Sequence, residues 1–170
     1  MFLNYIKEFF VKKSLKNDLN NVKIEAFTSN IQTVGLLVDE SDFQYSEVIV
    51  EELQLNGIRP KTIKIVSYTA KFKEREEYSN PTFGKKHINW KGEITENFLT
   101  DFIETEFDLL ISYYDVEKTI LMIVTNKSKA KFKVGFAPID KKLKRWMIAT
   151  TIESYKLFIS ELFKYLKNIK

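Results

Sequence analysis

The fold is decided by one continuous apolar stretch, Thr33-Val34-Gly35-Leu36-Leu37-Val38-Asp39. A run of this kind, polar only at its two ends, is typical of a strand buried on both faces of a parallel sheet. Residues 62–68 (Thr-Ile-Lys-Ile-Val-Ser-Tyr) form a second predicted strand, and a helix is expected between the two, ending near Gly57. A strand, a helix and a strand in this order predict parallel strands joined by a right-handed crossover.

The same alternation continues to the end of the chain. Further strands are predicted at 107–112, 132–136 and 146–150, and further helices at 94–104, at a segment ending near 127, and at 152–168. The first twenty residues are predicted to be helical, and residues 22–27 are a candidate edge strand. We therefore expect one α/β domain over residues 1–170, a three-layer sandwich with a mostly parallel, Rossmann-like sheet of about five strands. We place the first strand centrally, with the second and third on one side of it.

Composition excludes several classes of site. The chain has no cysteine and one histidine, so disulfides, cysteine-ligated metals and multi-histidine metal centres are excluded. Its five glycines never fall in a phosphate-binding spacing, and the turn after the first strand is acidic. No apolar run reaches the ~20 residues that span a bilayer, and the opening residues lack the pattern of a signal peptide. We expect a cytoplasmic protein with no cofactor, no metal and no identifiable catalytic residue.

Ligands of open parallel sheets bind beyond the carboxyl ends of the strands. The polar residues predicted at those ends, and therefore the candidate ligand crevice, are Asp39, Ser41, Ser112, Tyr114 and Asp115. The alternative interpretation is that Asp39, Ser41 and Asp115 cap the helices that follow, and residues 41–44 have the spacing of a capping box. The single histidine, His87, is interpreted as a surface or hydrogen-bonding residue of the polar segment 69–92. Whether that segment is an ordered lid or a mobile loop is left open.

Positive charge is concentrated in one segment. Residues 127–145 hold one acidic residue, Asp140, and eight basic ones, for a net charge of +7: Lys127, Lys129, Lys131, Lys133, Lys141, Lys142, Lys144 and Arg145. The whole chain carries +4, so the other 151 residues sum to −3. This asymmetry predicts a basic face for phosphate backbones. The alternative is an edge strand that lysines protect from aggregation.

The sequence also resembles two groups of known proteins. Residues 107–111 followed by 130–136 resemble part of the N-terminal Rossmann-like half of lipopolysaccharide heptosyltransferases, over about thirty residues. That resemblance implies the fold; the enzymes hold their nucleotide sugar with a second domain, for which this chain has no room. The chain as a whole, from residues 33–39 through 89–92, 108–111 and 133–136 to the last helix, is similar to a family of short uncharacterised bacterial proteins. This second resemblance implies no activity.

The leading hypothesis is a non-catalytic binding or accessory module whose basic face meets an anionic partner: RNA, in a ribosomal setting, or an acidic protein surface. One alternative is a small transferase-like or hydrolase-like enzyme that uses the strand-end crevice. Another is a membrane-peripheral or assembly protein that docks through its N-terminal helix, where Phe2, Leu3, Ile6, Phe9 and Phe10 form an apolar stripe ahead of Lys12, Lys13 and Lys16. Of these docking modes, a protein partner is preferred to a membrane surface.

Overall fold

A computed structural model describes residues 31–56, 58–137 and 146–168. Its elements, in chain order, are β1 (Thr33–Asp39), α4 (Ser46–Leu55), β2 (Thr62–Tyr68), β3 (Thr82–Phe83), the 3₁₀ helix η2 (Lys85–His87), α5 (Asn97–Glu104), β4 (Leu109–Tyr113), α6 (Thr119–Lys127), β5 (Phe132–Phe136), β6 (Trp146–Ile148) and α7 (Tyr155–Asn168). The bounds predicted for β1, β2 and β5 agree with the structure. The predicted helix at 1–20 and the predicted strand at 22–27 lie outside the described residues.

The described strands form one parallel sheet of six, in the order β3-β2-β1-β4-β5-β6. The predicted α/β sandwich with a parallel sheet is therefore confirmed. The first strand is an inner strand, as expected, but the expected placement of its neighbours is wrong, because β2 and β4 lie on opposite sides of β1 rather than on one side. After β3 the chain returns through α5 and places β4 against the free edge of β1. The point where the strand order reverses, between β1 and β4, is where ligands bind in sheets of this kind.

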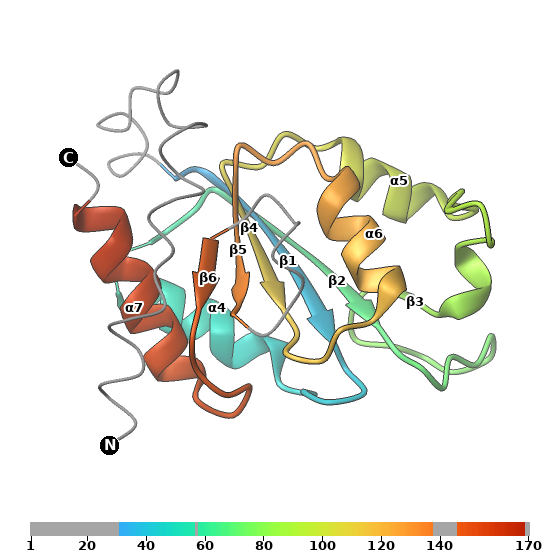
Figure 1. Cartoon of the computed structure of the whole chain (residues 1–170), viewed down its shortest axis with the longest axis horizontal. Helices are drawn as coiled ribbons and strands as arrows, with labels where there is room; N and C mark the ends of the chain where they lie inside the picture. The colour runs from blue at the N-terminus through green and yellow to red at the C-terminus, as the bar shows by residue number, and fades with distance from the viewer. Residues whose placement is uncertain (1–30, 57, 138–145, 169–170) are drawn as a thin grey trace.

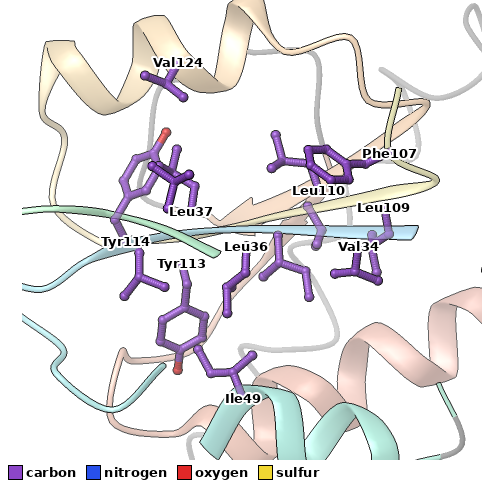
Figure 2. Packing of buried hydrophobic residues seen from close by; sticks show 14 of the residues in the cluster. Val34, Leu36, Leu37, Ile49, Phe107, Leu109, Leu110, Tyr113, Tyr114 and Val124 are labelled. Carbon is purple, nitrogen blue, oxygen red and sulfur yellow. The ribbon is translucent and has the colours of Figure 1, made fainter. Parts of the chain in front are cut away.

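Helices cover both faces of the sheet (Figure 1). α4 packs against α7 on one face, and α5 packs against α6 on the other. Figure 2 shows Ile49 of α4 below the sheet and Val124 of α6 above it, with buried side chains of β1 and β4 pointing alternately to the two sides. Gly35 is required in β1, because a Cβ built there would lie 2.7 Å from the Phe107 ring. That close approach lets a fully buried aromatic ring lie over the strand.

The predicted capping box at residues 41–44 is wrong. α4 begins only at Ser46, after Tyr45, and has no side-chain cap. The amides of Asp42 and Phe43 instead donate to the carbonyl of Asp39, and the Ser41 hydroxyl accepts a hydrogen bond from the Ala70 amide at 3.0 Å. Ser41 therefore links the turn after β1 to the turn after β2. Asp115 is not a helix cap either, since α6 begins four residues later, after Lys118.

The polar segment 69–92 contains regular structure. It supplies β3, which pairs with the end of β2, and η2 directly after it. Phe72 is central to the segment: its ring stacks on Tyr78 at 5.4 Å and meets the His87 ring edge-on at 4.6 Å. Because a Cβ at Gly84 would lie 2.4 Å from the Phe72 Cβ, this packing needs glycine at that position.

Candidate functional site

A buried ion pair lies beyond the carboxyl end of β1, at the point where the strand order reverses. The Asp39 side chain is fully buried, and its Oδ2 accepts a hydrogen bond from Nζ of Lys118, the residue before α6. The same ammonium donates to Asp42 Oδ2 at 2.9 Å, and it lies 5.7 Å from the centre of the Tyr68 ring. Lys118 therefore joins β1, the turn after it and the start of α6.

Charge and burial set the protonation of this pair. Burial raises the pKa of Asp39, while the hydrogen bond and positive charge of Lys118 and the hydrogen bond from Ser41 oppose that rise. Burial would lower the pKa of Lys118, but its contacts with Asp39 and Asp42 outweigh this effect and raise it. These contacts with Asp39 and Asp42 therefore favour the ammonium form of Lys118.

Ser112 and Tyr114 come together around a residue that the sequence did not single out. The hydroxyl of Thr125, on α6, lies 2.9 Å from the Ser112 hydroxyl and 2.9 Å from the Tyr114 hydroxyl. All three residues are buried. The Thr125 hydroxyl therefore bridges the other two hydroxyls and fastens α6 to the end of β4.

Asp115 follows Tyr114 in the loop between β4 and α6. Its carboxylate accepts a hydrogen bond from the backbone of Ile152, and burial together with the negative charges of Asp42 and Glu153 raises its pKa. Ser41 is exposed and is held to Ala70. Among the five predicted crevice residues, the structure makes two connections. Ser112 and Tyr114 are joined through Thr125. The Ser41 amide donates a 3.0 Å hydrogen bond to Asp39 Oδ1.

Four of the eight predicted partner-binding residues lie in the described part of the chain, and three of these have exposed side chains. Lys129 pairs with Glu104, and Lys131 Nζ lies 2.8 Å from Asp108 Oδ1. Lys127 Nζ donates to the carbonyl of Gly92 at 2.8 Å. These contacts lie around the amino ends of β4 and β5, away from the Asp39 pair. Lys141, Lys142, Lys144 and Arg145 lie outside the described residues.

Lys133 has a different role from the other three. Its side chain reaches the carboxyl end of α6, where Nζ donates to the carbonyls of Thr125 at 2.9 Å and Asn126 at 3.2 Å. Burial lowers its pKa. A cation at this position satisfies helix carbonyls that have no partner within the helix and stabilises the negative end of the helix dipole. Lys133 is therefore a helix-capping residue in the fold.

Sequence reasoning missed Lys118 and Thr125. Lys118 lies 79 residues from Asp39 along the chain, and a lysine before a helix carries no local signal of an ion pair. Thr125 stands in an apolar helix, where a β-branched residue is read as part of the core. Only the parallel pairing of β1 with β4, which brings α6 over the end of β1, could have indicated either contact.

Two general properties follow for the residues that the structure describes. Among them, no group of three or more histidine or acidic side chains is placed to hold a metal ion. No helix within 31–56, 58–137 and 146–168 combines the length and apolar character needed to cross a membrane.

Comparison with known proteins gives a family but no activity. No curated protein and no solved structure matches the chain. One family model does match, over residues 7–169, and it is described as a family of unknown function, DUF6913. The match includes every strand and helix described above, and the chain belongs to this family.

Proposed function

We propose that this chain is a cytoplasmic, non-catalytic binding or accessory module that meets an anionic partner, with RNA or the ribosome first and an acidic protein surface second. The observation that carries the proposal is the charge distribution: +7 over residues 127–145 in a chain of +4 overall. Phosphate backbones are bound by such concentrations of lysine and arginine, through release of their counterions. The resemblances found in the sequence also imply a bacterial origin and a likeness to part of the heptosyltransferases. We keep both as parts of this proposal, and neither implies an activity.

The contacts of the described lysines indicate which of them can bind the partner. Lys133 is committed to the end of α6, so we do not assign it to the partner. Lys129 and Lys131 pair with acidic residues, but both lysine side chains are more than half exposed. Solvent and salt screen ion pairs made by such exposed lysines, so both ammonium groups remain accessible to a phosphate. We expect the strongest contributions to partner binding from Lys141, Lys142, Lys144 and Arg145. The segment 141–145 contains no acidic residue.

The strand-end crevice supports an enzyme less well. Asp39, Ser112 and Tyr114 are fully buried, and each is hydrogen-bonded to another side chain of the protein. A substrate that used these groups would have to displace Lys118 or Thr125. The hypothesis of a transferase-like or hydrolase-like enzyme therefore needs a rearrangement of the loops that the binding hypothesis does not need. Docking through residues 1–12 involves only residues outside those described.

The test is sedimentation of a tagged protein from native lysate, at low and high salt, with and without RNase. The wild-type protein should sediment with large RNA or ribosomes at low salt and be released by salt or RNase. Changing Lys141, Lys142, Lys144 and Arg145 to glutamate should release it at every salt concentration. The unfolding temperature should stay within a few degrees of the wild type, because the proposal assigns these four side chains to the partner and not to the core of the fold.

The control is a variant with the same change of charge elsewhere. Lys61, Lys71, Lys73 and Lys156 are all exposed in the structure and lie outside the basic segment. Their replacement by glutamate should leave sedimentation much closer to that of the wild type. An equal loss of sedimentation with RNA in both variants would show that net charge alone causes the effect. Migration of the wild-type protein as a small free species in every condition would overturn association with RNA.

A further inference from the structure

A tight turn between η2 and α5 is held by several hydrogen bonds of Asn89. The side-chain Oδ1 of Asn89 accepts hydrogen bonds from the backbone amides of Lys91 at 2.9 Å and Glu93 at 3.0 Å. The backbone amide of Asn89 donates to the Glu93 carbonyl at 2.9 Å. Gly92 has φ of 76°, a left-handed conformation that favours glycine. The flanking residues Ile88 and Ile94 form an antiparallel bridge. We call residues 89–93 the Trp90 turn.

The Trp90 turn is also fastened to the rest of the fold. Lys127, in the last turn of α6, donates from Nζ to the Gly92 carbonyl at 2.8 Å. The turn therefore has a fixed position beside the first lysine of the basic segment. A fixed loop loses little conformational freedom when it binds a partner, which favours affinity.

This turn presents a tryptophan to solvent. The Trp90 side chain is 91% exposed, whereas Trp146 packs against Phe132 and Tyr165 at 5.1 Å from each ring. A buried aromatic side chain removes ~150–250 Å² from water, so the fold forgoes a large apolar contribution at Trp90. The ammonium of Lys91 lies 5.3 Å from the centre of the Trp90 ring. The turn thus combines an open aromatic ring with two nearby cations, Lys91 and Lys127.

The surroundings of Trp90 indicate the chemistry of its partner. The other large apolar side chains that the described residues expose are Tyr45, Leu55 and Val116. They lie outside the Trp90 turn, at the two ends of α4 and before α6. Protein interfaces centre on a wider apolar area, with charged residues depleted at its core. A nucleobase needs only one ring face to stack on and cations to meet the adjoining phosphates.

We propose that the Trp90 turn is a stacking platform for a base of single-stranded RNA, with Lys91 and Lys127 meeting the phosphates on either side. This inference rests on the proposed function and specifies the partner as an unpaired strand. A base stacks on the face of the indole that Lys91 leaves open. Regular duplex RNA would not satisfy the platform, because its bases are already stacked on one another.

The experiment is a fluorescence titration of the full chain in a Trp146→Phe background, which leaves Trp90 as the single tryptophan. The probes are oligoadenylate RNA of about twelve nucleotides, an abasic RNA of the same length and the matching DNA. Oligoadenylate should quench Trp90, and the abasic strand should not. Trp90→Ala, measured with a labelled strand, should weaken oligoadenylate binding by roughly 5- to 150-fold and leave abasic binding unchanged.

Controls separate this inference from the proposed function. Tyr45→Ala removes a different exposed aromatic ring, 67% exposed, and should not change RNA affinity. Binding that needs Lys141, Lys142, Lys144 and Arg145 but is unchanged by Trp90→Ala would overturn the stacking platform alone. No binding of any strand at low salt would overturn both the platform and the RNA form of the proposed function. Tighter binding of the DNA strand would overturn the assignment to RNA.

Discussion

At the scale of single residues, His87 shows how far a local pattern can predict a side chain's role. Its hydrogen-bonding role agrees with one of the two interpretations drawn from the sequence, but its position is not on the surface. The residue is 8% exposed, and Nδ1 accepts a hydrogen bond from the Gly84 amide at 3.1 Å. An acceptor at Nδ1 means that the neutral ring carries its proton on Nε2. Burial lowers the pKa of His87, although Glu96, 3.8 Å from Nε2, opposes the shift.

This protonation predicts a pH dependence of stability. Because the folded state holds the pKa of His87 below its unfolded value of about 6.5, the neutral ring stabilises the fold above that pH. The contribution is lost as the pH falls below about 6.5 and through the lower folded pKa. A protonated Nδ1 would also face the Gly84 amide as a second donor. His87→Asn keeps an acceptor in a similar position without titrating in this range.

The measurement is urea unfolding at several pH values between about 5 and 8. The free energy of unfolding should fall more steeply with acidification in the wild type than in His87→Asn, since carboxylates titrate alike in both. Parallel curves for the two proteins would contradict the assigned role. The sequence could not supply this role, because the Gly84 amide reaches His87 only through the turn of η2.

At the scale of elements, the pair of Asp39 with Lys118 links two segments at the carboxyl end of the sheet. It joins β1 to the start of α6 across the point where the strand order reverses. Removing one partner of a buried pair leaves the other charge without compensation in a medium of low dielectric constant. Replacing both partners by neutral side chains removes that penalty.

Lys118→Met should therefore reduce the free energy of unfolding by about 3–5 kcal/mol at neutral pH. The double variant Asp39→Asn with Lys118→Met should recover a large part of this loss. Both values come from equilibrium urea unfolding, and the slope against urea concentration checks that the folded states are comparable. A Lys118→Met protein as stable as the wild type would show that the pair contributes nothing to the fold.

The elements also show where local patterns mislead. The sequence predicted the bounds of β1, β2 and β5 to the residue. In β1 the signal is a continuous apolar run, because six of its seven residues are buried, whereas β2 and β5 each carry a lysine among apolar residues. The start of α4 was misplaced because Ser41 resembles a helix cap, while its hydroxyl bonds to Ala70, 29 residues away in the chain. β3 was missed because a strand of two residues is too short to show alternation. The polar contacts of the candidate site likewise join residues distant in sequence.

At the scale of the whole molecule, the strand order determines which parts open first. β1 and β4 each have a neighbour on both sides, whereas β3 and β6 have one each among the described residues. Amides in the centre of the sheet should therefore exchange with solvent only through global unfolding. In hydrogen exchange followed by mass spectrometry, peptides covering Leu36 and Ile111 should be protected longest, and those covering Phe83 and Met147 should exchange earlier. Equal protection across all four would contradict this order.

The strand order itself was not predictable from the sequence. Consecutive strands usually lie next to each other, and that tendency led us to place the third predicted strand on the same side as the second. The long excursion 69–92 gave no sign that the chain would cross back over β1, because the packing of Phe107 on Gly35 becomes visible only once β1 and β4 are paired. The alternation of strands and helices was enough to predict the fold class. Predicting the strand order would have required knowledge of the contact between Phe107 and Gly35.

The lengths of the outermost strands have a consequence for the protein at high concentration. β3 has two residues and β6 three, so the described sheet ends on both sides in strands much shorter than its centre. A second molecule finds little exposed backbone there on which to extend the sheet. Crowded copies of this protein therefore lack a ready template for fibre growth along the described strands.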